Sequence, residues 1–199
     1  MHTATVVPSL TKADARSKAL ADRKVYARSL NFDLRSALET QLMQRVLPHI
    51  GAASAIGTYH PMKDEIDPTP IADALAAAGH VVALPWFAAR DAAMMFRAAP
   101  AEQLELRPGP WGVLQPGADA AAVAPEIVLV PLVAADAACN RIGHGKGHYD
   151  RALAHLRQSG AVRTIGLAWD MQILDGMIDA DPWDVPLDAI ATPDRWFVK

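Results

Sequence analysis

The 199-residue sequence predicts one α/β domain spanning residues 1–199, with a mostly parallel sheet flanked by helices on both faces. Short apolar segments alternate along the chain with segments of helical periodicity. The apolar segments are nearly continuous, as in strands that are buried on both sides. Hydrophobic residues make up 51% of the chain, which is enough to form one substantial core.

Two helices are expected before the first strand. Thr11 can cap a helix that continues to about Arg28, because its hydroxyl can accept a hydrogen bond from a first-turn N–H. Asn31 can cap a second helix, which Pro48 ends near His49. The second helix has an apolar residue every fourth position, at Leu34, Leu38, Leu42 and Val46.

Strands and helices then alternate to the end of the chain. A helix is expected at residues 68–78, where Gly79 stops it, and another at 151–157. The segment at 108–112 is a connection rich in proline and glycine. The expected strands span residues 53–59, 80–85, 94–97, 127–131, 163–168 and 189–192.

The segment at residues 140–151 carries the strongest functional signal. Three of its glycines alternate with other residues, Lys146 lies among them, and Arg141 and Arg151 flank them. We expect this loop to join the buried strand at 127–131 to a helix that begins near Arg151. In such a turn, backbone N–H groups can approach a phosphate closely, and the helix N-terminus adds partial positive charge. The sequence therefore predicts a phosphate loop beyond the carboxyl end of a strand, where ligands bind in such sheets.

The glycine spacing matches neither common phosphate motif. A dinucleotide fingerprint requires two residues between its second and third glycines, and here Lys146 alone separates them. A P-loop requires Ser or Thr after its lysine, and Gly147 stands there instead. A loop that is rich in glycine only because it turns tightly remains an alternative, although the flanking arginines favour an anion.

Composition and charge exclude several function classes. A net charge of −3 gives no reason to expect nucleic-acid binding, and no apolar segment is long enough to span a membrane. No secretory signal peptide is expected. Cys139 is the only cysteine, which fits a reducing cytoplasm, and we expect it to fill a turn rather than to react. These features predict a cytoplasmic monomer that binds small molecules.

The run from Arg141 to Asp150 resembles the signature of the 5-formyltetrahydrofolate cyclo-ligase family, Arg-Leu/Ile-Gly-x-Gly-x-Gly-x-Tyr-Asp after an apolar strand. Other segments match the family in the same order, over nearly the whole chain. They are Lys12 and Arg16 as Lys-x-x-x-Arg, the acidic segment 64–67, the strand 79–85, the turn 111–116, the segment 165–168, and Gln172, Asp184, Asp188 and Thr192. The sequence departs from the family pattern at Pro68, Gln115, Ala135 and Cys139, and Gln115 and Ala135 bear on the shape of the folate pocket.

The resemblance implies conversion of 5-formyltetrahydrofolate and ATP into 5,10-methenyltetrahydrofolate, ADP and phosphate, through phosphorylation of the formyl oxygen. It implies Mg²⁺ as the metal, held by Asp150 and Asp184, and Arg141 and Lys146 as the catalytic cations. The implied folate contacts are His60, Glu65, Trp111 and Tyr149. The implied ATP-binding residues are Lys12, Arg16, Arg141, Gly143, His144, Gly145, Lys146, Gly147, His148, Tyr149, Asp150 and Arg151.

Other interpretations stay open at this point. Sugar-phosphate isomerases and CoA transferases have a similar architecture and use no ATP, and a folate- or nucleotide-binding protein without turnover is a third alternative. Several predicted site residues also have a plain structural explanation. Lys12 and Arg16 could form a solvated helix face, Asp150 could be an ordinary carboxylate at a helix start, and Glu65 could be a surface acid. Trp111 and Tyr149 could be core residues, and Asp184 is one of several nearby acids with Asp181 and Asp188.

Overall fold

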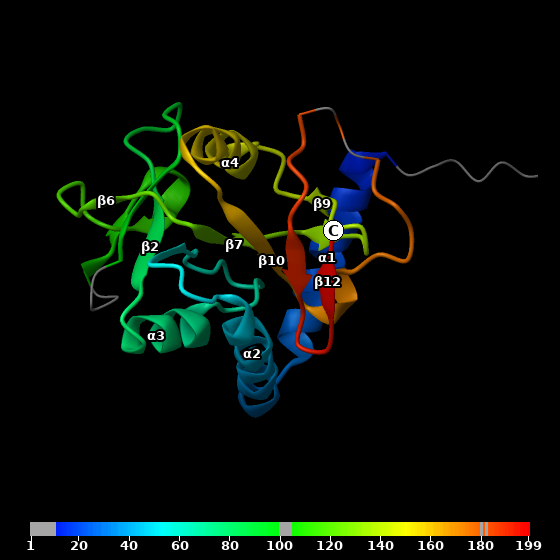
Figure 1. Ribbon diagram of the computed structural model, residues 1–199. Helices are drawn as coiled ribbons and strands as arrows, with labels where there is room; N and C mark the ends of the chain where they lie inside the picture. Colours follow the sequence, from blue (N-terminus) through cyan, green and yellow to red (C-terminus); the bar gives the residue numbers. More distant parts are fainter. Residues whose placement is uncertain (1–10, 100–104, 180, 182) are drawn as a thin grey trace, which may run out of the picture.

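A computed structural model describes residues 11–99, 105–179, 181 and 183–199. Its main feature is an eight-stranded sheet with the order β12-β11-β10-β7-β1-β2-β3-β6 (Figure 1). The parallel centre consists of β1 (Ala55–Gly57), β2 (Val81–Trp86), β7 (Ile127–Pro131), β10 (Arg163–Leu167) and β11 (Ala189–Ala191). The antiparallel edges are β3 (Met95–Ala98), β6 (Ala122–Val123) and β12 (Trp196–Val198). The predicted α/β class and mostly parallel sheet are confirmed.

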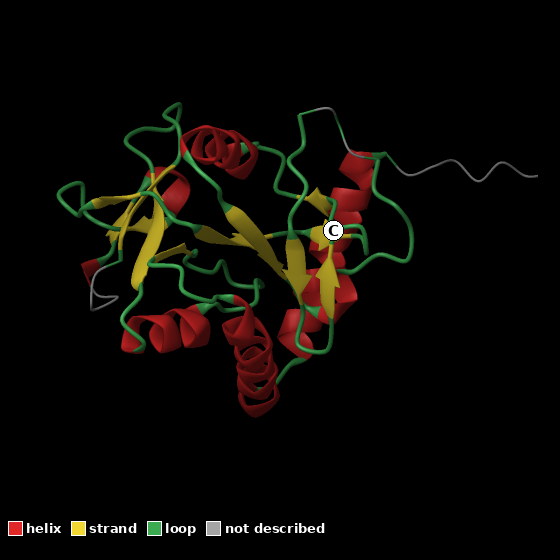
Figure 2. Cartoon of the chain, viewed as in Figure 1, coloured by secondary structure: helices red, strands yellow, loops and turns green. Residues whose placement is uncertain are grey.

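Helices cover both faces of this sheet (Figure 2). In Figure 1, α2 (Phe32–Val46) and α3 (Thr69–Ala77) lie below the sheet, and α4 (His148–Ser159) lies above it. Strand β7 shows why its sequence is continuously apolar, because both of its faces are buried. Ile127 and Leu129 belong to the core between the sheet and helices α2 and α3, whereas Val128 and Val130 pack on the side of α4.

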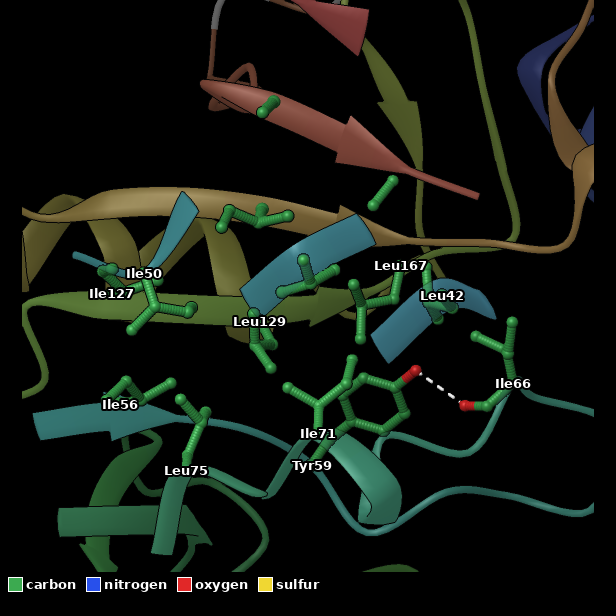
Figure 3. Close-up of a cluster of buried hydrophobic side chains, with 14 of the residues drawn as sticks. Leu42, Ile50, Ile56, Tyr59, Ile66, Ile71, Leu75, Ile127, Leu129 and Leu167 are labelled. Atoms are coloured by element: carbon green, nitrogen blue, oxygen red, sulfur yellow. Dashed lines mark hydrogen bonds between the residues drawn. The ribbon is translucent and has the colours of Figure 1, made fainter. Parts of the chain in front are cut away.

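The larger core lies between the sheet and helices α2 and α3 (Figure 3). Leu42 from α2 and Ile71 and Leu75 from α3 are almost completely buried there. Tyr59 follows β1 and enters the same core, where its hydroxyl donates to the carbonyl oxygen of Ile66 at 2.8 Å. This bond fixes the loop between β1 and α3 at the carboxyl end of the sheet.

The two predicted helix caps are confirmed. The Thr11 hydroxyl accepts a hydrogen bond from Asp14 N at 3.2 Å, and α1 (Lys12–Ser29) follows. The Asn31 side chain accepts from Leu34 N at 2.8 Å, and α2 follows. A 3-10 turn, η1 (Leu47–His49), comes after α2. Helix α1 packs through Ala19 against the chain that follows β7, so it lies beside the carboxyl ends of the central strands.

Two details of the glycine-rich segment differ from the prediction. A small antiparallel hairpin of β8 (Ala134–Ala135) and β9 (Arg141–Ile142) separates β7 from the glycines. Helix α4 begins at His148, three residues before the expected start at Arg151. The earlier start arises because Gly147 adopts the left-handed region, with φ of 62°, and forms the N-cap of the helix.

Short elements complete the fold. They are β4 (Arg107–Pro108), η3 (Pro110–Gly112), β5 (Leu114–Gln115) and η4 (Asp170–Gln172). Cys139 is buried in the turn between β8 and β9 and has a φ of 65°, which explains why the family pattern has glycine there. Of the helices in the described part of the chain, none is long and apolar enough to cross a membrane.

Candidate active site

A cavity of about 990 Å³ lies at the carboxyl ends of the central strands. Tyr59 beyond β1, Phe87 beyond β2 and Pro131 at the end of β7 form part of its wall. Such cavities are the usual ligand sites of parallel α/β sheets. The cavity brings together every residue that the sequence predicted for the site: Lys12, Arg16, His60, Glu65, Trp111, Arg141, Gly143, His144, Gly145, Lys146, Gly147, His148, Tyr149, Asp150, Arg151 and Asp184.

The glycine loop is shaped by two left-handed residues and one arginine. Gly145 and Gly147 have φ values of 84° and 62°, which side-chain-bearing residues rarely adopt. A Cβ atom on Gly147 would also lie 3.0 Å from the Arg151 guanidinium. Arg16 reaches over from α1, and its Nε donates to the Gly143 carbonyl oxygen at 2.8 Å. Arg16 therefore ties α1 to the loop, and is not part of a solvated helix face.

Cations and carboxylates alternate along one side of the cavity. Lys12 Nζ donates to Asp181 Oδ2 at 2.8 Å and also to Asp184. Arg141 donates to Asp150 Oδ1 at 2.5 Å. The same Asp150 oxygen accepts from Val185 N at 3.3 Å, which places Asp150 beside the segment that carries Asp184. We call Lys12, Arg141, Asp150, Asp181 and Asp184 the charged wall.

These pairings shift two pKa values. Burial acts to raise the pKa of Asp184, but the hydrogen bonds from Lys12 and Asp181 N and the nearby positive charges hold it below its ordinary value. For Lys12, burial acts to lower the pKa, and the two carboxylates outweigh it and raise the pKa. Both side chains therefore stay charged across the neutral range.

Asp150 and Asp184 are suited to a hard cation. In sites that handle phosphates, Mg²⁺ is usually held by one or two carboxylates together with water and the phosphates. Within the described ranges, no three His, Cys, Asp or Glu side chains converge as they would in a metal cage made by the protein alone. Two carboxylates beside a glycine loop fit the former arrangement.

Glu65 is a buried carboxylate, 4% exposed, so the surface-acid alternative is wrong. Its Oε2 accepts from Met62 N at 2.9 Å, and its Oε1 lies 3.7 Å from Arg23 NH1 on α1. His144 Nε2, from the glycine loop, lies 3.2 Å from the same Oε1. The loop after β1 and the glycine loop therefore meet at Glu65.

Aromatic rings form another part of the cavity wall. The Trp111 ring centroid lies 5.2 Å from that of Phe87 and 4.8 Å from that of His148. The Gln115 side chain holds Phe87 in place, because its amide accepts from Phe87 N and donates to Phe87 O, both at 3.1 Å. We call Phe87, Trp111 and His148, with the neighbouring Met94 and Leu114, the apolar wall.

The two residues that follow Gly147 have shifted pKa values. Burial, together with the charges of Arg151 and Lys146, lowers the pKa of His148. Arg151 donates to His148 Nδ1 at 3.2 Å, so Nε2 carries the proton, and Nε2 has no hydrogen-bond partner among the described residues. Burial, and then the negative charge of Glu65, raises the pKa of Tyr149. Near neutral pH both side chains are uncharged donors at the cavity.

Several cavity residues were missed from the sequence. The sequence indicates Asp181 only as a neighbour of Asp184, and nothing near Arg23 in the sequence indicates that it faces Glu65 from another element. Phe87 directly follows the apolar strand β2, and nothing in that part of the sequence indicates that it lines a site. Further wall residues without a sequence signal are Tyr59, Met62, Pro85, Met94, Val113, Leu114, Pro131, Ala154 and Trp183.

The fold and the cavity define an α/β protein with a cavity at the carboxyl ends of its parallel strands, lined in part by charged side chains. The sequence matches the 5-formyltetrahydrofolate cyclo-ligase family over residues 9–193, and the chain belongs to that family of ATP-dependent ligases. The resemblance found in the glycine run is thereby confirmed.

Two named relatives and one solved structure are similar to the chain over most of their length. The chain is 29% identical to the 5-formyltetrahydrofolate cyclo-ligase of Escherichia coli K12 over 152 residues, covering 74% of this chain and 82% of the relative. It is 26% identical over 198 residues to the mouse protein of the same name, covering 94% and 97% of the two chains. The NMR structure of Aquifex aeolicus 5,10-methenyltetrahydrofolate synthetase superposes with a TM-score of 0.74 at 26% identity, covering 94% of this chain and 92% of the other.

Proposed function

We propose that the protein converts 5-formyltetrahydrofolate and ATP into 5,10-methenyltetrahydrofolate, ADP and phosphate. The observation that carries this proposal is the meeting of two loops in one cavity. His144 of the glycine loop lies 3.2 Å from Glu65, so a pterin at Glu65 and a phosphate on the glycine loop would be neighbours. Neighbouring substrates are what a transfer between them requires.

The chemistry explains why ATP is needed. The formyl oxygen is a poor leaving group, so attack of N10 on the formyl carbon stalls. Transfer of the γ-phosphoryl group forms an O–P bond to that oxygen and breaks the bond to ADP. N10 then bonds to the carbon and loses its proton, and the C–O bond breaks to release phosphate. The protein contributes positioning and charge stabilisation.

The glycine loop and its cations bind the phosphates in this proposal. Backbone N–H groups around Gly143, Gly145 and Gly147 donate to phosphate oxygens, and the N-terminus of α4 adds partial positive charge. Arg141 and Lys146 stabilise the charge that develops during transfer. Lys12 and Arg16 from α1 add charge, and the remaining contacts come from His144, His148, Tyr149, Asp150 and Arg151.

Asp150 and Asp184 would hold Mg²⁺, which supplies charge neutralisation at the phosphates when it is bound. Asp150 lies in the first turn of α4, and Asp184 is held by Asp181 N at 2.8 Å. Both carboxylates are thus fixed in direction before the metal arrives.

Glu65 would accept hydrogen bonds from the amino and ring N–H groups of the pterin. Arg23 supplies the positive charge that a buried carboxylate requires. Trp111 and Tyr149 would offer ring faces to the folate, and His60, which lines the same cavity, would be a further folate contact. We further propose that the protein acts as a cytoplasmic monomer on small molecules, without nucleic acid or membrane.

The test mixes the purified protein with 5-formyltetrahydrofolate, Mg²⁺ and ATP and follows the near-ultraviolet absorbance of the methenyl product. The proposal predicts that this absorbance grows only when ATP is present. Binding of both substrates without product would instead favour a binding protein. Activity on a sugar phosphate or a CoA ester without ATP would favour the isomerase or transferase alternative.

A further inference from the structure

Each carboxylate that we assign to Mg²⁺ is already paired with a cation that we assign to phosphate. Asp184 is paired with Lys12, and Asp150 is paired with Arg141. A divalent ion on either carboxylate would lie close to the paired cation, and like charges at such distances repel. The ligand-free charged wall therefore opposes metal binding until a paired cation finds another partner.

Lys12 is the cation that is free to move. It is the first residue of α1, its side chain is 23% exposed, and four rotatable carbons carry its ammonium group. Arg141 is 6% exposed and lies in β9, within the hairpin, so its position is fixed by the backbone. Lys12 also lies one helical turn from Arg16, which already contacts the glycine loop.

We propose that Lys12 is the resident counter-ion of Asp181 and Asp184 in the ligand-free protein, and that it moves onto the nucleotide phosphates when Mg²⁺ binds. This inference rests on the proposed function, because it takes the phosphates to be those of ATP. Asp181 acts as a positioning residue, since it holds Lys12 through Oδ2 and Asp184 through its backbone N–H.

Cooperative binding of metal and nucleotide follows from this exchange. Mg²⁺ frees Lys12 for the phosphates, and the phosphates remove from Asp184 the charge that opposes Mg²⁺. The coupling is reciprocal, so each ligand tightens the other by the same factor. Removing the Lys12 charge should therefore tighten Mg²⁺ alone and weaken ATP alone. A residue that only supported the fold would change both affinities in the same direction.

The experiment measures binding by calorimetry on the full chain without folate, using Mg²⁺ alone, ATP alone with a chelator, and both together. For Lys12→Met we expect Mg²⁺ alone to bind several-fold more tightly and metal-free ATP to bind about tenfold more weakly, as for one lost charge-assisted hydrogen bond. The matched control is Lys18→Met. Lys18 lies on the same helix, is exposed and pairs with Asp22 at 2.5 Å, so both affinities should stay unchanged.

Lys12→Gln, which removes the charge and keeps a donor, should behave as Lys12→Met does, and thermal unfolding checks that each variant is folded. Unchanged or weaker Mg²⁺ binding in both folded variants would overturn the counter-ion exchange and leave the proposed function standing. Absence of coupling between Mg²⁺ and ATP in the natural protein would overturn it as well. Failure of the natural protein to bind ATP in any combination would instead overturn the proposed function.

Discussion

The charged wall and the apolar wall of the cavity are held in different ways. In the charged wall, Lys12 and Arg141 pair with carboxylates, and in our proposal Lys12 exchanges its carboxylate partners for phosphate while Arg141 stays in place. In the apolar wall, ring contacts and the two hydrogen bonds between Gln115 and Phe87 fix the surface within the protein itself. The charged wall would thus bind its ligands by exchange of ion-pair partners, whereas the apolar wall is a preformed surface.

The largest effect is expected from Arg141→Met in the charged wall. The change removes a buried cation beside the glycine loop and leaves Asp150 without its partner. We expect kcat/KM for ATP to fall by about 100- to 1,000-fold, as when one preorganised charge stabiliser is lost. Steady-state kinetics check this. Arg163→Met, at an exposed strand start where the side chain donates to His49 O, serves as the control. If kcat/KM for ATP falls no further in Arg141→Met than in Arg163→Met, Arg141 has no catalytic role.

A smaller and more selective effect is expected in the apolar wall. Trp111→Ala removes a ring that faces the cavity and contacts Phe87 and His148. We expect KM for the folate to rise about tenfold, which corresponds to roughly one lost aromatic contact, with little change in KM for ATP. If the two KM values rise equally, the Trp111 ring does not act selectively on the folate. Trp196→Ala, at the ring stacked on His49, is the matched control.

Gln115→Glu tests whether the apolar wall is preformed by the amide. A carboxylate cannot donate to Phe87 O, so at neutral pH a buried acceptor would face another acceptor. We expect the free energy of unfolding to fall by about 1–3 kcal/mol. The pKa of the new carboxyl group would be raised, so stability should recover as the pH falls and the group becomes a donor. Urea unfolding at pH 7 and at pH 5 measures the loss in the free energy of unfolding at each pH. An equal loss at both pH values would contradict this account.

The smallest effect concerns His148 in the apolar wall. Its pKa lies below 6.5 because of burial and then the charges of Arg151 and Lys146. As the pH falls below 6.5, His148 is therefore protonated more readily in the unfolded chain than in the folded one. Protonation favours the unfolded chain, so the free energy of unfolding decreases in this pH range. His148→Phe keeps a ring in the wall and should remove this part of the pH dependence, by less than about 1 kcal/mol. An NMR titration midpoint of His148 at or above 6.5 would contradict the assignment.

Local signals predicted the fold well. Thr11 and Asn31 begin their helices as the sequence indicates, and the continuously apolar β7 lies buried on both faces. The start of α4 was missed, because the left-handed conformation of Gly147 depends on its setting and not on its identity alone. The β8–β9 hairpin was missed because strands this short carry no periodicity.

The candidate site, like the fold, was predicted in part from the sequence. The glycine run and the family pattern placed the predicted residues in one cavity, while their roles stay predictions. Partners that come from distant elements carry no local signal, as for Arg23 beside Glu65 and Asp181 beside Lys12. The same is true of Gln115, whose replacement of the family's glutamate became meaningful only beside Phe87.

In the proposed reaction, one cavity transfers the γ-phosphoryl group of ATP onto the formyl oxygen. The most direct test uses 5-formyltetrahydrofolate labelled with oxygen-18 in the formyl group, and ³¹P NMR of the phosphate released in a single turnover. The account predicts that the label appears in inorganic phosphate, because the formyl oxygen leaves as part of it. Unlabelled phosphate, with the label in water, would contradict the account, since the oxygen would then have left without being phosphorylated.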